Sequence, residues 1–266
     1  MLDAGFQDVG IDLIYNWPGQ SEKEILEDLE VIKSLDLAGL SFYALILMEG
    51  TTLHRMISAG QCPPLGDLVQ EKRFFDHILD ELTDQGFSLL EFTKLVKPGR
   101  DEYRYVRIRY DNGDTLALGA GAGGRLGDQI YRNPSDIPRY RQHVENPAES
   151  SIMGFRVDRS YDLANRLIGK LEFGGFEWST LEAFPNDGDT IGAMHTLTKE
   201  LAADGLVQTD FHGLLLTREG TFWGNNIAQE FASTLAKAFK GGGNGHASAT
   251  HVSTGRGVSH PLPGVG

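Results

Sequence analysis

The chain has 266 residues, of which 40% are hydrophobic, a length that allows one large domain or two of moderate size. Its formal net charge of −13 opposes nucleic acid and anionic membrane surfaces as partners. No apolar run approaches the roughly 18 residues of a transmembrane helix, and the acidic N-terminus lacks a signal-peptide core. The single cysteine, Cys62, fits a reducing compartment, so we expect a cytoplasmic protein without disulfide bonds.

The first elements along the chain are predicted to form one strand–helix–strand unit over residues 9–47. Residues 9–15 are a near-continuous apolar run, typical of a parallel strand buried on both faces. Ser21 with Glu24 three positions later is a capping-box signature for a helix that follows. Residues 39–47 are a second buried strand, so the unit predicts a parallel sheet and an α/β fold.

Asp12 interrupts the first apolar run. A carboxylate that is buried without a partner costs several kcal/mol, so its place in a buried strand needs an explanation. Two interpretations remain open from the residues alone. Asp12 either forms a buried salt bridge with Lys or Arg, or accepts hydrogen bonds from ligand hydroxyls at the mouth of a barrel.

The segment from 49 to 110 contains three further predicted elements. Residues 49–67 are mostly connection with one helical turn, and Asp67 caps a helix that stops at Gly86. Residues 87–96 are predicted as a strand. Residues 103–110 alternate aromatic or aliphatic residues with arginine, which predicts a strand with one solvated face.

Arg104, Arg107 and Arg109 lie in this last stretch. Guanidinium groups pair with carboxylates through two parallel hydrogen bonds, so the three arginines are candidates for binding an anionic substrate. The alternative is a solvated strand face.

Residues 115–134 are predicted to form a short apolar strand that runs into the glycine-rich loop GAGAGG, residues 119–124. Glycines allow backbone N–H groups to approach a ligand closely. The spacing matches neither the dinucleotide-binding fingerprint nor the P-loop, and a tight turn is the alternative.

A domain boundary is predicted near residue 150, which gives a first domain over 1–150. Residues 151–239 are mostly helical, with two short strands around His212-Gly213, in a winged-helix-like order. Residues 240–266 are rich in Gly, Ser, His and Thr and are predicted to be a disordered tail. The histidines show no metal-ligand spacing, so no metal site is expected in this chain.

Several stretches together resemble one family over residues 5–235. The sequences "DLIYNWPGQ", "SFYAL", "LALGAGAGG" and "DGLVQTDFHGLLLTREG" resemble the radical S-adenosylmethionine (SAM) enzymes related to oxygen-independent coproporphyrinogen III oxidase. The resemblance implies the C-terminal part of a partial TIM barrel followed by a mainly helical, winged-helix-like domain. The chain departs from the commoner "YGLPGQT" at Asn16, Trp17 and Ser21.

The resemblance also implies site residues. In the family the Asp of "DLIY" contacts SAM at the barrel mouth, which corresponds to Asp12, and the next strand brings Ala44 near the same cofactor. The glycine-rich loop, with Gly119 and Gly121, would lie close to the active site.

A 4Fe–4S cluster is implied for the family but has no ligands in this sequence. Family members hold the cluster through C-x3-C-x2-C, and reduction of SAM at the cluster gives a 5′-deoxyadenosyl radical. With one cysteine, the resemblance implies an N-terminally truncated chain that is inactive alone. The full-length parent would take electrons from a flavodoxin or ferredoxin.

Several branches of the family remain open. "ALGAGAGG" and "IMGFRVDRSYDLAN" favour the haem-utilisation branch, which degrades haem anaerobically. The alternatives are oxidative decarboxylation of coproporphyrinogen III, a haem chaperone, and a catalytically inactive remnant or half of a split protein. The branches share an anionic tetrapyrrole ligand, haem or coproporphyrinogen.

Overall fold

The computed structural model describes residues 4–146, 153–184 and 188–241, and these residues form two compact units. The first unit comprises residues 4–102 and 216–226, and the second comprises the described parts of 103–215 and 227–241. The predicted boundary near residue 150 lies outside the described residues, as does the predicted tail, 240–266, apart from its first two residues, which end a helix.

The first unit is built on a four-stranded sheet with the order β1-β2-β4-β3. β1 and β2 are parallel, with Gly10 opposite Gly39 and Asp12 opposite Ser41, and the other two pairings are antiparallel. This confirms the strand–helix–strand unit predicted over residues 9–47. The strands are β1 (Gly10–Tyr15), β2 (Gly39–Ala44), β3 (Ser88–Glu91) and β4 (Lys94–Val96).

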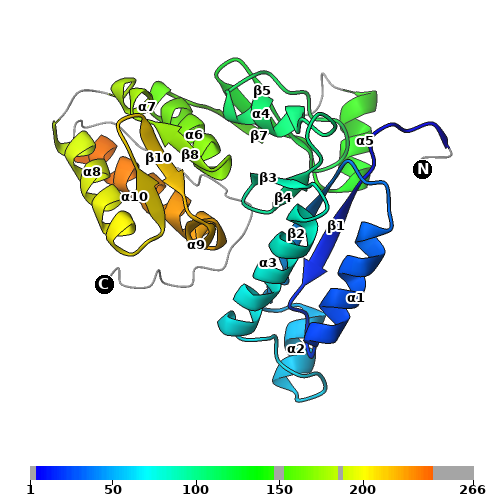
Figure 1. Cartoon of the computed structure of the whole chain (residues 1–266). Coiled ribbons are helices and arrows are strands. Elements are labelled where there is room, and N and C mark those ends of the chain that lie inside the picture. The colour runs from blue at the N-terminus through cyan, green and yellow to red at the C-terminus, as the bar shows by residue number, and fades with distance from the viewer. Residues whose placement is uncertain (1–3, 147–152, 185–187, 242–266) are drawn as a thin grey trace. The chain divides into compact units, whose positions relative to one another are not determined.

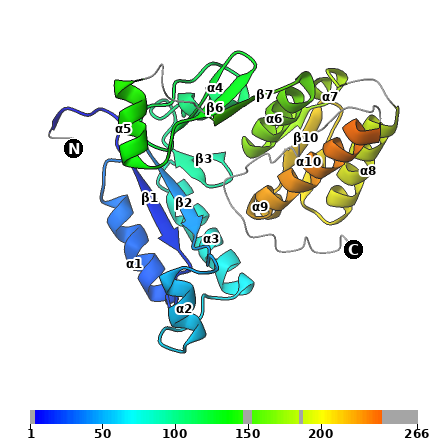
Figure 2. The ribbon, with the colours of Figure 1, turned by 180° about the vertical axis from the view of Figure 1, so that it is seen from behind.

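Helices cover one face of this sheet (Figures 1 and 2). α1 (Glu22–Lys33) and α3 (Leu68–Thr83) contribute fully buried side chains to the same core as Leu40 and Phe42 of β2. The capping box predicted for α1 is confirmed, because the Ser21 hydroxyl and the Glu24 carboxylate each accept from the other's backbone N–H. The unit's remaining helices are the short α2 (Thr52–Ser58) and α9 (Arg218–Phe222).

The prediction that the β1 strand is buried on both faces is wrong. β1 lies at the edge of the sheet, and its exposure alternates, with Asp12 and Ile14 exposed and Tyr15 buried. Only the face that carries Ile11, Leu13 and Tyr15 packs on the helical core. Asp12 therefore remains in water, and the buried salt bridge considered for it is not needed.

Three boundaries in the first unit differ from the sequence predictions. β2 ends at Ala44 rather than at residue 47, and the connection 49–67 holds a full helix, α2, capped by Thr51. The strand predicted over 87–96 is two strands, β3 and β4, which turn back at Phe92-Thr93. A local pattern cannot distinguish one apolar strand from a tight hairpin of the same composition.

The second unit contains two three-stranded sheets, β5-β6-β7 and β8-β10-β9, together with helices. The strands are β5 (Gly123–Leu126), β6 (Gln129–Arg132), β7 (Met153–Arg156), β8 (Gly175–Glu177), β9 (Val207–Thr209) and β10 (Gly213–Leu216). The helices are α4 (Arg104–Tyr110), α5 (Ile137–Glu145), α6 (Arg159–Glu172), α7 (Ser179–Glu182), α8 (Gly188–Ala203) and α10 (Gly224–Gly241), whose first residues belong to the first unit. The predicted strand pair around His212-Gly213 is confirmed, whereas the winged-helix-like order stays a prediction.

The strand predicted over 103–110 is a helix, α4, and this is a correction. Its buried residue, Val106, and the half-buried Tyr110 are four positions apart, which is helical spacing. Tyr110 packs against α6 where Gly169 leaves room for its ring. The alternation of arginines with apolar residues matched a strand by coincidence. The helix is instead stabilised by packing of Tyr110 on Gly169, 59 positions away in the sequence.

The apolar strand predicted before the glycine-rich loop is also wrong. Residues 116–122 form no strand, and Leu116 and Leu118 are 70% and 84% exposed. The strand β5 begins only at Gly123, inside the glycine run, and pairs with β6 in an antiparallel hairpin. The position of β5 is therefore determined by its pairing with β6 rather than by local hydrophobicity.

Candidate functional site

The first unit has a pocket of about 360 Å³ at the carboxyl ends of its two parallel strands. β1 ends at Tyr15 and β2 ends at Ala44, and both residues line the pocket. Ligand sites of α/β folds form at this end because the chain leaves neighbouring parallel strands in different directions. The volume lies within the range of small-molecule pockets, roughly 300 to 1,000 Å³.

Asn16, at the end of β1, lines this pocket and is held by hydrogen bonds to two other lining residues. It is 1% exposed and has a φ of 58°, a left-handed conformation that Gly and Asn tolerate best. Its side-chain amide donates to the carbonyl of Gly66 at 3.2 Å and to the carboxylate of Glu71 at 3.3 Å. The pattern that this stretch resembles has Gly at this position, and Asn is a residue that tolerates the same left-handed backbone.

The N-terminus of α3 forms a second wall. Asp67 caps the helix by accepting a hydrogen bond from the N–H of Gln70 at 2.8 Å, as the sequence predicted. Leu68, Glu71 and Phe75 from the first turns of α3 line the pocket beside it. The wall therefore combines apolar surface with carboxylates at the helix end.

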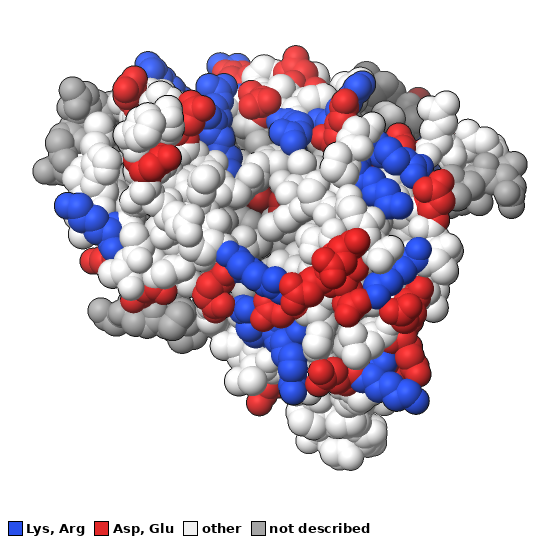
Figure 3. Space-filling view, in the orientation of Figure 1, with Lys and Arg blue, Asp and Glu red and all other residues white. Residues whose placement is uncertain are grey.

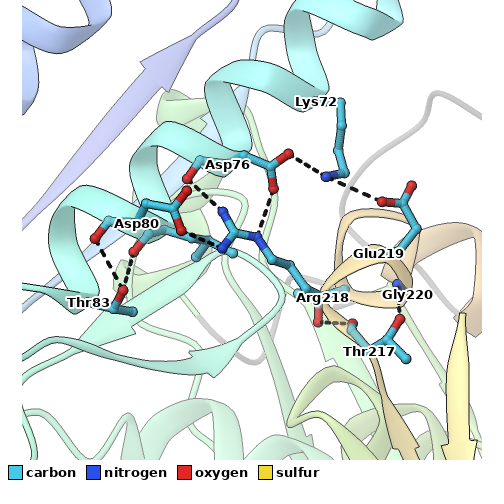
Figure 4. Close-up of polar contacts among 10 residues, drawn as sticks. Lys72, Asp76, Asp80, Thr83, Thr217, Arg218, Glu219 and Gly220 are labelled. Atoms are coloured by element: carbon cyan, nitrogen blue, oxygen red, sulfur yellow. Dashed lines mark hydrogen bonds and ion pairs between the residues drawn. The ribbon is translucent and has the colours of Figure 1, made fainter.

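The third wall comes from residues 221–226, which are far away in the sequence and are held in place by the neighbouring Arg218. Arg218 of α9 donates through Nε to Asp76 at 2.8 Å and through a terminal nitrogen to the Asp76 carbonyl at 2.8 Å, and it also pairs with Asp80 (Figure 4). Lys72 bridges Asp76 and Glu219, with 3.3 Å to the latter. These contacts anchor α9 on α3, and acidic and basic side chains adjoin over these two helices (Figure 3).

The same cluster shifts the pKa values of its members. The hydrogen bond from Arg218 is the main cause that lowers the pKa of the Asp80 carboxyl below its ordinary value. The hydrogen bond to Asp80 is likewise the main cause that raises the pKa of Arg218. Both groups are therefore charged at neutral pH, as the anchoring of α9 requires.

The anchored segment places aromatic and amide side chains over the pocket. Phe222 packs edge-on against Phe75 with ring centroids 5.3 Å apart, and Trp223, Asn225 and Asn226 also line the pocket. Sequence reasoning missed these residues because it assigned residues 151–239 to a separate domain. The run "GTFWGNN" gives no local sign that it packs on a distant part of the chain. The hydrogen bond that anchors it joins Arg218, just before the run, to Asp76, 142 positions away.

The pocket lining therefore combines aromatic rings with side-chain amides and carboxylates. Flat heteroaromatic ligands with hydrogen-bonding edges suit such a surface, because the rings cover their faces and the polar groups fix their orientation. A nucleoside is a ligand of this kind.

Two of the predicted cofactor residues lie in the first unit but in different surroundings. Ala44 lines the pocket. Asp12 is on the opposite pleat of β1 from Tyr15, on the exposed face of the sheet, and does not line the pocket. The two residues predicted to bind SAM thus lie on opposite faces of the sheet, near the carboxyl ends of β1 and β2.

Gly119 and Gly121 lie in the second unit, in the loop before β5. The N–H of Gly119 donates to the hydroxyl of Tyr140 at 3.0 Å, and that of Gly121 donates to the carbonyl of Pro134 at 2.9 Å. Asn133 donates to the Gly119 carbonyl at 2.9 Å. Both glycine N–H groups therefore already have acceptors within the second unit.

The three arginines lie on α4 and take different directions. Arg107 stacks over the Phe173 ring at 4.3 Å, and Arg109 lies 5.8 Å from the Tyr105 ring. Arg109 lines a second pocket, whereas Arg104 and Arg107 do not. Helical geometry separates the three residues that the strand prediction had grouped.

The side chains of this chain do not fit an iron–sulfur cluster. A 4Fe–4S cluster needs three or four thiolates, and the sequence has only Cys62, which is partly exposed in the connection before α3. Within the described ranges, no group of three or more His, Cys, Asp or Glu side chains could hold a metal ion. Among the same residues, no helix has the length and apolar character needed to cross a bilayer.

No family model matches the sequence. The chain is 23% identical over 243 residues to the heme chaperone HemW of Bacillus subtilis, an alignment of 88% of this chain and 61% of that protein. It is 22% identical over 219 residues to the anaerobilin synthase of Escherichia coli, covering 82% of this chain and 48% of that protein. The chain thus spans about half to three fifths of the length of these relatives.

A solved structure confirms the fold class. Coproporphyrinogen III oxidase (HemN) from Escherichia coli, described as a radical SAM enzyme, superimposes with a TM-score of 0.70 and 21% identity. The match covers 87% of this chain and 56% of the HemN chain. The chain is an α/β protein with the fold of a HemN segment and is homologous to HemW, anaerobilin synthase and HemN.

Proposed function

We propose that this homologue of the radical SAM proteins binds the adenosyl part of SAM in the pocket of the first unit and acts on a tetrapyrrole. The observation that carries the proposal is the pocket at the carboxyl ends of β1 and β2, with Ala44 in its wall. The aromatic rings of Phe75 and Phe222 would cover the adenine face, and side-chain amides of the lining would bind its edge. SAM supplies radical chemistry when it is bound in enzymes of this family.

Asp12 does not line the pocket, so we propose that it binds the part of the cofactor that extends past the ends of β1 and β2 to the exposed face of the sheet. Its carboxylate is exposed and makes no hydrogen bond or ion pair with a residue in the described part of the chain. A free carboxylate is a strong acceptor for ribose hydroxyls, since hydrogen bonds to a charged group are roughly twice as strong as neutral ones. The cluster ligands and the electron donor, a flavodoxin or ferredoxin, would come from outside this sequence.

Haem is the tetrapyrrole we propose first, in a haem-utilisation role. The anaerobilin synthase match supports this role over four fifths of the chain, at 82%. A haem-chaperone role is the second candidate, because the HemW match covers 88% of the chain. Oxidative decarboxylation of coproporphyrinogen III remains the third, from the likeness to the HemN sequences.

Binding of S-adenosylhomocysteine, followed by calorimetry, tests the cofactor part of the proposal. We expect saturable binding by the unmodified chain and a loss of about tenfold or more in Ala44→Leu, which fills the pocket wall. Ala59→Leu, at an exposed position after α2, is the matched control and should bind as the unmodified chain does. Equal binding by both variants, or no binding by any of the proteins, would refute the adenosyl pocket.

Haem titration, followed by the Soret band, tests the tetrapyrrole part separately. A saturable shift with one haem per chain is the expected result. Coproporphyrin III, titrated in parallel, should bind more weakly if the haem assignment is correct. A linear, non-saturating response to both compounds would refute a tetrapyrrole ligand while leaving the adenosyl result intact.

A further inference from the structure

A second pocket, of about 280 Å³, lies wholly within the second unit. It is bordered by α4, the start of α6 and the β5–β6 hairpin. Tyr105 and Arg109 of α4, Arg125 of β5, and Tyr161 and Asn165 of α6 contribute its polar and aromatic groups. The pocket plays no part in the adenosyl site, which belongs to the first unit.

The two arginines of this pocket differ in what they already bind. Arg125 is neutralised, because its terminal nitrogens donate to the two carboxylate oxygens of Asp162 at 2.6 and 2.9 Å. Arg109 makes no ion pair and no side-chain hydrogen bond with any residue in the described ranges, and its guanidinium lies 5.8 Å from the centre of the Tyr105 ring. The pocket therefore carries one uncompensated positive charge, on Arg109.

Tyr161 supplies a hydrogen-bond donor next to that charge. Its hydroxyl has no hydrogen-bond partner among the described residues, although the side chain is only partly exposed. Burial raises the pKa of the Tyr161 hydroxyl, and the nearby Arg125 and Arg109 charges oppose this rise. The hydroxyl is therefore protonated at neutral pH and can donate.

The position of Arg109 is fixed by the helix that faces it. The side-chain amide of Asn165 donates to the backbone carbonyl of Arg109 at 2.9 Å and to the side-chain oxygen of Asn112 at 2.8 Å. Asn112 also accepts from Arg125 at 3.3 Å. These contacts tie the end of α4 to α6, so the guanidinium is presented from a held backbone, which lowers the entropic cost of binding.

We propose that Arg109 and Tyr161 bind a side-chain carboxylate of the tetrapyrrole. An unpaired guanidinium and a hydroxyl donor facing one pocket match the two oxygens of a carboxylate. The Tyr105 and Tyr161 rings and Ile130 provide apolar surface for the adjoining part of a flat macrocycle. The inference rests on the proposed tetrapyrrole function and selects Arg109 from the three candidate arginines.

Fluorescence titration with protoporphyrin IX and with its dimethyl ester tests the proposal, since the ester removes only the carboxylates. The unmodified chain should prefer the free acid by about tenfold. Arg109→Gln should abolish this preference, and Tyr161→Phe should reduce it by about threefold. Arg107→Gln, on the same helix and with the same charge change, should leave the preference unchanged, because Arg107 stacks on Phe173 outside the pocket.

Each other outcome overturns the inference in a recognisable way. Equal affinity for acid and ester, or a preference that survives in Arg109→Gln, excludes a carboxylate at this site. Equal losses in Arg107→Gln and Arg109→Gln would indicate general charge attraction. Competition by inorganic phosphate would indicate an unselective anion site, and failure of both porphyrins to bind the unmodified chain would refute the tetrapyrrole function itself. Circular dichroism melts establish that each variant is folded.

Discussion

Asp12 shows how a residue's surroundings separate a structural role from a functional one. It is exposed and unpaired among the described residues, so Asp12→Asn should change the free energy of unfolding by less than about 0.5 kcal/mol. The same substitution should weaken S-adenosylhomocysteine binding by about tenfold, because it removes a charged acceptor. Urea unfolding and calorimetry measure the two effects. A large stability loss, or unchanged binding, would contradict the role proposed for Asp12.

The Asp80–Arg218 pair predicts a specific dependence of stability on pH. Arg218 lowers the folded-state pKa of Asp80 below the unfolded value of about 3.9, so the pair stabilises the fold above that pH. The contribution is lost as the pH falls through the lower, folded-state pKa. The pair is exposed, with side chains 44% and 62% accessible, so we expect no more than about 1 kcal/mol.

Comparison of Asp80→Asn with the unmodified chain by urea unfolding measures this effect. The stability difference between them should be present at pH 6 and should shrink toward about pH 3. In an Arg218→Met background the pH dependence of the difference should vanish. A difference that grows on acidification, or that persists without Arg218, would contradict the assignment.

At the residue scale, the cap Asp67 is confirmed and Ala44 lines the pocket, its cofactor role staying a prediction, whereas sequence reasoning placed Asp12 in the wrong environment. The apolar run around Asp12 predicted burial on both faces, whereas β1 is an edge strand with one covered face. Whether a strand is central or at an edge depends on its neighbours, and a single strand's composition does not record it. Asn16 is easier to interpret from the sequence. It replaces the Gly of the pattern that this stretch resembles, and Asn tolerates the left-handed backbone found there.

At the element scale, α4 is the clearest failure of pattern reasoning, and its packing gives a test. Gly169 lies within α6, where Ala would be favoured by about 1 kcal/mol from helix propensity alone. A Cβ at Gly169 would lie 2.3 Å from the Tyr110 side chain of α4, so Gly169→Ala should instead destabilise the protein by about 1–2 kcal/mol. Thermal or urea unfolding measures the sign.

The sign should reverse when the opposing ring is removed. In a Tyr110→Ala background, Gly169→Ala should be neutral or stabilising, because the clash is absent and only helix propensity remains. Stabilisation by Gly169→Ala in the unmodified chain would contradict the packing of α4 on α6. The element boundaries set by local chemistry, the caps of α1 and α3 above all, were predictable because their hydrogen bonds join residues within one turn.

At the scale of the whole molecule, the parallel strand pair and its helix could be predicted from periodicity, whereas the composition of the pocket could not. One wall depends on α9, which joins α3 through Arg218 across 142 positions. Contacts of such separation leave no periodic signal in the sequence. The candidate site is therefore only half visible in the sequence, through Ala44 and the ends of β1 and β2.

Mapping S-adenosylhomocysteine binding by amide chemical shifts in the labelled chain tests the central claim most directly. We predict shifts in three separate stretches that meet at the pocket, residues 44–47, 65–71 and 221–226, and a further shift at Asp12 of β1. Residues 103–215 should be unaffected, because the adenosyl pocket lies within the first unit. Shifts confined to the second unit, or no saturable shifts at all, would contradict an adenosyl site at the strand ends of this protein.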